Sequence, residues 1–309
     1  MPRVSATLLP SKCSAIQPEG DAAVIDARDS RTLAIVTDST ADIAPALAAS
    51  RGITVVPLSV TFGDETFPDG ILTQQQFFDR MRTAPHLPTT SQPSIGAFAE
   101  VYERALERAE HVISVHISNQ LSGTLESARQ AAEQFAGRVH VFDSLNLSWG
   151  LGWQVIGAAE AAAEGLDHAA VLERLARLRE RVKLIVGLDS LDNLARGGRI
   201  GKVGAFLGAV LHLKVTFTVD EHGAFSPVGR DRGEKAALRH TLGWVAEQMG
   251  SATKGRFAVG HALSLQRAQD LAQEISARYT ATQMVIYEAG SVISTHTGTG
   301  WGVAVLPEE

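Results

Sequence analysis

The chain has 309 residues, of which 45% are hydrophobic and 20% charged, and its formal net charge is −6. This composition is typical of a globular protein with a sizeable core, and the negative charge argues against extensive nucleic-acid binding, which requires a basic face. The single cysteine, Cys13, excludes an intrachain disulfide framework and a zinc ribbon, and no apolar run approaches the roughly 18 residues of a membrane span.

The first thirty residues differ in character from the rest of the chain. Residues 1–30 contain Arg3 and Lys12 but lack the apolar segment of a secretory signal, and they show neither helical nor strand periodicity. We therefore expect a flexible N-terminal extension over residues 1–30. The single cysteine also fits a reducing compartment, so we expect a cytoplasmic protein without stable membrane insertion.

Strand-like and helix-like segments alternate from Thr32 onward, which predicts an α/β fold. In the first half, the pattern predicts strands at 33–37, 53–62, 111–117 and 139–142 and helices at 43–49, 73–82, 94–106 and 121–135. Thr73 and Ser94 are the expected helix caps.

An Ala- and Gly-rich helix at 149–165 is expected to pack closely against its neighbours, and Asp167 is expected to cap the helix that follows it. The β/α rhythm restarts at Lys183, so we place a domain boundary near Gly150, between an N-terminal domain at 31–150 and a C-terminal domain at 151–309. The second half is predicted to contain strands at 184–188, 257–259, 284–287 and 303–306, a hairpin at 213–228 and helices at 234–249 and 265–279.

Several catalytic motifs are absent or incomplete. The segment 197–203 resembles a phosphate-binding loop but is one residue short and lacks the Ser or Thr that would hold Mg²⁺. The segment 298–302 reads G-x-G-x-G and precedes a strand, and no G-x-S-x-G sequence occurs. His111 and His116 are expected on opposite faces of one strand, so they cannot share a metal. We therefore expect no cofactor, no metal and no catalytic residue.

Three polar clusters remain, at 88–94, 118–124 and 296–300. The first two precede predicted helices, where hydroxyls and exposed amides suit an anion, although helix capping alone would also explain them. In a parallel sheet the second cluster would follow the carboxyl end of a strand, where ligands of open α/β folds bind. His296 lies in a predicted glycine-rich turn and could donate to a carboxylate or form a charge pair with it. Together these clusters suggest a pocket for an anionic small molecule.

Two basic groups occur in the second half of this acidic chain. The first comprises Arg196, Arg199 and Lys202, and the second comprises Arg230, Arg232 and Lys235. They are either solvated surface residues or a local positive patch suited to phosphate or to an acidic partner.

The motifs, taken in order, resemble those of the DegV family. The resemblance extends over about residues 33–307 and rests on seven segments: V-T-D-S-T-A-D at 36–42, V-P-L at 56–58, P-T-T-S-Q-P-S at 88–94, L-S-G-T at 121–124, D-N-L-A-R-G-G-R-I at 192–200, V-G-R-D-R-G-E-K at 228–235 and H-T-G-T-G at 296–300.

This resemblance implies a two-domain α/β fold, with a β-sheet flanked by helices in each domain and a ligand tunnel between the domains. The implied ligand is a long-chain fatty acid such as palmitate. The implied partner is a separate fatty-acid kinase of the dihydroxyacetone-kinase type, which phosphorylates the presented carboxylate and so supplies acyl-phosphate to lipid synthesis. The chain itself would be a non-catalytic carrier.

The resemblance also assigns roles to individual residues. Thr90, Ser122 and His296 match the carboxylate-binding positions of the family, and Ser91, Gly123 and Thr124 would support the pocket. Arg199 and Arg232 match arginines that face the kinase or the phosphate. Two departures occur: Thr299 replaces the proline of the family's H-x-G-P-G, and Lys214-Val215 replaces a Lys-Pro pair.

Two other functions remain open. The chain could be an acyl hydrolase or transferase that uses Ser122 and His296, although the sequence shows no acid to orient the histidine. It could also be a lipid sensor that works without a kinase.

Overall fold

The computed structural model describes residues 31–199 and 213–308, which carry three β-sheets. The predicted extension at 1–30, Cys13, Lys202 and most of the segment that resembles a phosphate loop lie outside these residues. The α/β class is confirmed, and so are the helix caps Thr73, Ser94 and Asp167, whose side chains each accept a hydrogen bond from a first-turn amide. No helix in the described ranges is long and apolar enough to cross a membrane.

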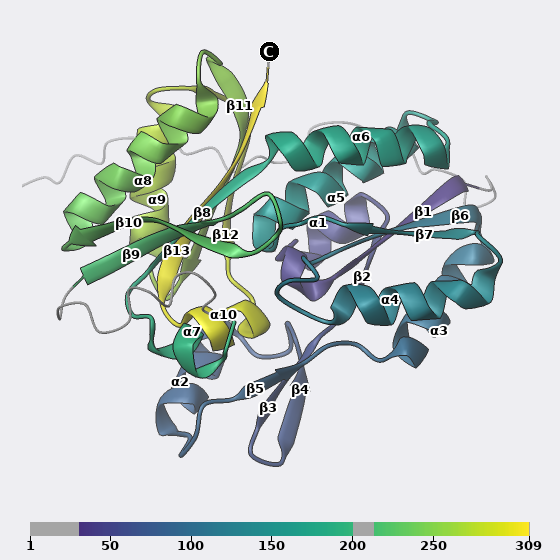
Figure 1. The fold of residues 1–309 in the computed structure, drawn as a ribbon, viewed down its shortest axis with the longest axis horizontal. Helices are drawn as coiled ribbons and strands as arrows, with labels where there is room; N and C mark the ends of the chain where they lie inside the picture. The colour runs from purple at the N-terminus through teal and green to yellow at the C-terminus, as the bar shows by residue number, and fades with distance from the viewer. Residues whose placement is uncertain (1–30, 200–212, 309) are drawn as a thin grey trace, which may run out of the picture. The chain divides into compact units, whose positions relative to one another are not determined.

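The first sheet is parallel and contains four strands (Figure 1). Its order is β2 (Ile53–Val56), β1 (Arg31–Asp38), β6 (Ala109–His116) and β7 (Val139–Asp143). Helices α3 (Ile95–Leu106) and α4 (Thr124–Ala132) pack on one face, where Phe98 and Tyr102 are fully buried against Val36 and Val112. This sheet directs the carboxyl ends of β1 and β6 to the same edge.

The second sheet contains six strands and is mostly antiparallel. Its order is β10 (Phe225–Arg232), β9 (Leu213–Val219), β8 (Lys183–Leu188), β13 (Gly300–Glu308), β11 (Lys254–Ala262) and β12 (Thr280–Glu288). β11 and β12 run parallel, and the other neighbouring strands run antiparallel. Helices α8 (Glu234–Met249) and α9 (Leu265–Ser276) contact this sheet (Figure 1). The predicted hairpin at 213–228 is confirmed by the β9–β10 pair.

A small third sheet has the order β4 (Glu65–Pro68), β3 (Ser59–Phe62) and β5 (Thr89–Ser91) and is antiparallel. It packs with α2 (Gln74–Thr83) through Phe77 and Phe78. The predicted strand at 53–62 is therefore divided: β2 joins the parallel sheet and β3 joins the small one. Pro57 lies at the break, where its missing amide hydrogen prevents a continuous ladder.

Helix α5 (Ser148–Ala163) contacts strands of both large sheets and is buried along most of its length. One core cluster joins Ile113 of the first sheet, Trp153 of α5 and Phe217 of the second sheet. A side chain at Gly157 would overlap Leu178 of α6 (His168–Arg181), which confirms the predicted close packing. The division into domains at residue 150 stays a prediction, and Gly150 lies inside α5.

Three shorter helices complete the described elements: α1 (Pro45–Ser50), α7 (Asp192–Arg196) and α10 (Ser291–Thr297), together with single 3-10 turns at Ser39–Ala41 and Glu133–Phe135. His296 therefore lies on a helix, and its predicted place in a glycine turn is wrong. The predicted loop around Thr90 is likewise wrong, because Thr90 is the central residue of β5. The N-cap of α4 is Gly123 and neither Ser118 nor Ser122.

Candidate functional site

Thr90 and His296 meet although they lie 206 positions apart in the sequence, with 2.9 Å between Thr90 Oγ1 and His296 Nε2. Thr90 is held by the pairing of β5 with β3, where it lies opposite Val60. His296 is held by α10, which packs against α7 through a hydrogen bond from Asn193 Nδ2 to the carbonyl of Thr295 (3.1 Å). Two of the three predicted carboxylate-binding residues are thus in direct contact.

Ser122 lines the same pocket as Thr90 and His296. Its Oγ lies 2.8 Å from Thr124 Oγ1 and accepts a hydrogen bond from the Thr124 amide at 3.3 Å. The described contacts thus pair Ser122 with Thr124 and His296 with Thr90, which is not the serine–histidine contact that a hydrolase requires. The other lining residues are mostly apolar: Thr40, Leu58, Ile117, Leu121, Leu147, Arg199, Phe225, Val292, Ile293 and Thr297.

Arg199 supplies the positive charge of this pocket. Burial and the nearby Arg199 guanidinium lower the pKa of His296 to about 4, so the imidazole is neutral at pH 7. Arg199 itself is exposed and its Nη1 donates to the carbonyl of Gly197 at 2.8 Å. The cation that faces an anionic ligand here is therefore the arginine, while the histidine contributes a neutral polar group.

Gly197 controls the position of the His296 ring. A Cβ at Gly197 would lie 2.5 Å from His296 Nδ1, so a side chain there would displace the imidazole. Among the described residues, Nδ1 has no hydrogen-bond partner although it is buried. The glycine of the R-G-G-R motif thus has a steric role that the sequence pattern alone does not reveal.

Gly123 has a related role on the other side of the pocket. A side chain at Gly123 would overlap the Gln92 amide, whose Nε2 donates to Ser127 Oγ at 2.8 Å. The missing Cβ of residue 123 thus leaves room for the Gln92 amide between the turn before α4 and the segment after β5. Gly123 thereby places the segments of Ser122 and Thr90 side by side.

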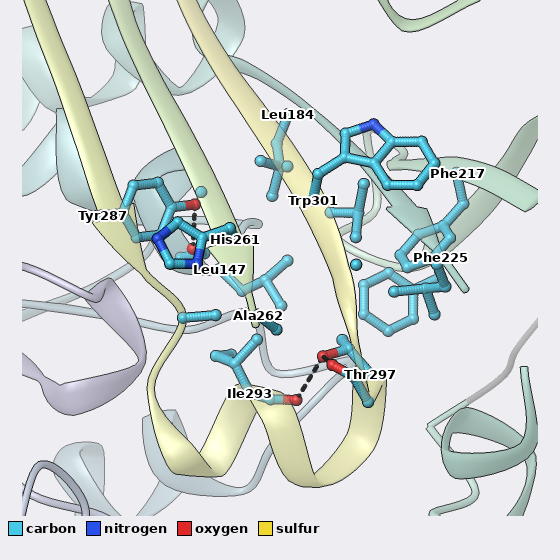
Figure 2. Close-up of a pocket in the computed structure, with 18 residues that line it drawn as sticks. Leu147, Leu184, Phe217, Phe225, His261, Ala262, Tyr287, Ile293, Thr297 and Trp301 are labelled. Carbon is cyan, nitrogen blue, oxygen red and sulfur yellow. Dashed lines mark hydrogen bonds between the residues drawn. The ribbon is translucent and has the colours of Figure 1, made fainter. Parts of the chain in front are cut away.

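A second, apolar pocket adjoins this one. The two pockets share Leu147, Phe225, Ile293 and Thr297. The second is lined largely by the six-stranded sheet, with Phe217 and Phe225 prominent in Figure 2 and Ile293 and Thr297 presented by α10. The Trp301 indole lies on the other face of this sheet, where its Nε1 donates to Thr241 of α8 at 3.0 Å. A side chain at Gly260 would overlap the ring of Tyr287, so this glycine makes room for the aromatic lining.

A buried polar group lies at the apolar pocket and was not predicted from the sequence. Ser148, which has a positive φ of 49°, donates to Asp42 Oδ2 at 2.6 Å, and its Oγ lies 2.7 Å from Tyr287 Oη. Burial raises the pKa of Asp42 to about 8, although hydrogen bonds from Ser148 and the Gly290 amide oppose the shift. The signal available in the sequence was Asp42 itself, the last residue of V-T-D-S-T-A-D.

A second buried network joins β1 to β6. Asp38 Oδ2 lies 2.9 Å from His116 Nδ1, and His116 Nε2 lies 2.6 Å from Ser114 Oγ, which in turn contacts Tyr102 Oη at 2.9 Å. This Ser–His–Asp row has the contacts of a catalytic triad, which the sequence did not suggest. All four side chains are 0% exposed and none lines either pocket, so the row holds the two strands together.

A sequence model of the DegV family, described as uncharacterised, matches residues 32–308. The chain belongs to the DegV family. A DegV domain-containing protein of Deinococcus radiodurans is 39% identical over 291 residues, covering 89% of this chain and 99% of the relative. Another from Streptococcus pneumoniae is 33% identical over 276 residues, covering 88% and 97%.

Solved structures of DegV proteins share the fold. A fatty-acid-binding DegV protein from Thermus thermophilus is 38% identical with a TM-score of 0.86, covering 90% of this chain and all of that one (100%). DegV of Bacillus subtilis, described as a fatty acid binding protein, is 31% identical with a TM-score of 0.83 and the same coverage, 90% and 100%. The expected α/β fold of the DegV family, with β-sheets flanked by helices, is thus confirmed.

The other residues assigned from the DegV motifs lie partly at the polar pocket and partly outside it. Thr124 is fully buried and contacts Ser122, whereas Ser91 is exposed and does not line the pocket. Arg232 is exposed at the end of β10, also outside the pocket lining. Thr299, at the departure from the family motif, accepts a hydrogen bond from the Asp189 amide at 3.1 Å, so the turn after α10 keeps a defined anchor.

Proposed function

We propose that this chain binds one long-chain fatty acid, such as palmitate, with the carboxylate at Thr90, Ser122 and His296 and the tail in the apolar pocket. The observation that carries the proposal is the arrangement of the two adjoining pockets. Thr90, Ser122, Arg199 and His296 are gathered in one, and the other is lined mainly by aromatic and aliphatic side chains. The relatives described as fatty-acid-binding support it, at 38% and 31% identity.

A fatty acid has an apolar tail and a charged carboxylate, which match the apolar and the polar pocket. Burial of a sixteen-carbon tail at about 0.8 kcal/mol per methylene contributes roughly 10 kcal/mol before ordering costs. A buried carboxylate must have its lost water replaced by hydrogen-bond donors. The hydroxyls of Thr90 and Ser122 and the His296 imidazole supply such donors, and Arg199 supplies the compensating charge.

The proposal extends to a carrier role. The chain presents the carboxylate to a separate fatty-acid kinase of the dihydroxyacetone-kinase type in the cytoplasm and keeps the acyl-phosphate, without catalysing a reaction itself. Support comes from Arg199, which is exposed and also lines the polar pocket, and from Arg232, which is exposed at the end of β10. Both can contact phosphate or an acidic partner surface.

Lipid extraction tests the binding step. Denaturing mass spectrometry of extracts from the purified protein should find one fatty acid per chain. Changing both Thr90 and Ser122 to Ala should remove most of it, because the carboxylate loses two donors. Thr66→Ala is the matched control, since Thr66 is an exposed hydroxyl that contacts Thr61 on the small sheet. Equal lipid content in all three proteins would contradict the proposed carboxylate site.

A charge reversal tests the carrier step separately. Arg232→Glu should retain the fatty acid, because Arg232 does not line the pocket, but should abolish acyl-phosphate formation by the kinase. Arg108→Glu, at an exposed arginine after α3, should change neither. Normal acyl-phosphate formation with Arg232→Glu would contradict the role of this arginine. If the parent protein carries a fatty acid that no such kinase phosphorylates, the result would instead favour a lipid sensor.

A further inference from the structure

Three histidines from separate elements gather away from the fatty-acid pocket. They are His111 of β6, His140 of β7 and His168, the first residue of α6. One ligand nitrogen from each lies within 4.8 Å of the other two, and all three side chains are partly buried. We propose that these histidines form a binding site for a divalent transition metal, with Zn²⁺ as the representative ion.

The spacing of the nitrogens fits such an ion. His140 Nε2 lies 3.1 Å from His111 Nδ1. Nitrogens bound at 2.0–2.1 Å to a tetrahedral zinc lie roughly 3.3 Å from each other, so this pair already has the required separation. Since every pair of ligand atoms lies within 4.8 Å, the His168 ligand atom has to move by at most about 1.5 Å.

The three imidazole rings are packed face to face or tilted, so they must turn before their in-plane lone pairs can converge on one ion. The His168 ring stacks on both others, with centroids 4.2 Å from His111 and 4.6 Å from His140. When a metal binds, the proton shared by His111 and His140 must move to the outer nitrogen of its ring.

The position of the cluster separates this site from the lipid site. His111 lies near the amino-terminal end of β6, whereas Ile117 of the polar pocket follows its carboxyl end, six residues or roughly 20 Å away. Helix α6 and the β6–β7 edge would be joined by the ion (Figure 1). Three protein ligands leave a fourth position for water, and imidazole ligands suit zinc, copper and nickel.

Calorimetric titration of the full, untagged and chelator-treated chain with ZnCl₂ tests the site. We expect one Zn²⁺ per chain and an increase in Tm on binding. His168→Asn should weaken binding at least about tenfold and abolish the increase in Tm. His140→Gln should do the same. His222→Asn is the control, because His222 lies in the hairpin turn with its side chain 75% exposed.

His168 is partly buried and is the first residue of α6, so its replacement is expected to leave the metal-free Tm nearly unchanged. The test can therefore be interpreted even if the His140 variant is unstable. The proposal is overturned if the titration of the parent protein shows no binding of Zn²⁺ with a stoichiometry of one ion per chain. It is equally overturned by His168→Asn binding as tightly as the parent.

Discussion

His296 combines a contact with Thr90, a buried Nδ1 without a partner among the described residues and a pKa lowered to about 4. These properties follow from the position of the ring, which is partly buried against Gly197 and lies near Arg199. A neutral imidazole can share a hydrogen bond with a hydroxyl and later with a carboxylate. The sequence could identify the residue from its motif, but it could not predict the burial that sets its charge.

The low pKa of His296 makes stability depend on pH. The folded-state pKa of about 4 lies below the ordinary value of 6.5, so the unfolded chain binds more protons between these values. The resulting contribution to the free energy of unfolding is fully present above pH 6.5. It is lost as the pH falls towards 4, by up to about 3 kcal/mol.

Urea unfolding of delipidated protein between pH 7 and pH 4.5 measures this dependence. His296→Gln cannot take up the proton, so the variant should lose less stability over this range than the parent. Identical pH dependence of the two proteins would show that the imidazole is not enclosed as described.

At the scale of elements, the sequence predicted most helices and strands because their apolar periodicity and caps are local signals. Helices with capping residues, such as α2 and α6, were predicted within one or two residues. The predictions were wrong for two short elements. β5 has three residues, and α10 has seven residues and is rich in β-branched side chains. Both are stabilised mainly by tertiary contacts, so local propensity is a poor guide to them. These two elements carry Thr90 and His296.

The turn before α4 offers a test at this scale. Gly123 has a φ of −74°, which alanine can adopt, so Gly123→Ala acts through the overlap with Gln92. The Gln92–Ser127 hydrogen bond should break, at a cost of about 1 kcal/mol in the free energy of unfolding.

A double-mutant cycle isolates this effect. In a Gln92→Ala background the overlap is gone, so adding Gly123→Ala should be nearly neutral. Denaturant unfolding of the four proteins gives the coupling energy. A cost of Gly123→Ala that is the same in both backgrounds would contradict the packing role of Gly123.

At the scale of the molecule, residues 31–199 and 213–308 bring the two large sheets together around α5, and the adjoining pockets take their lining from both halves of the sequence. The order of elements predicted an α/β fold, and the family motifs supplied most of the polar pocket. The aromatic lining, the Asp42–Ser148–Tyr287 group and the histidine trio were not predicted. Each depends on residues far apart in sequence whose contacts only the folded chain creates.

The crystal structure of the palmitate complex tests the central claim most directly. We expect the carboxylate within hydrogen-bond distance of Thr90 Oγ1 and Ser122 Oγ, next to His296, and the tail among Phe217, Phe225 and Ile293. A fatty acid bound in the opposite direction, with its carboxylate at Ser148 and Tyr287, would contradict the account. So would a lipid bound outside these two pockets.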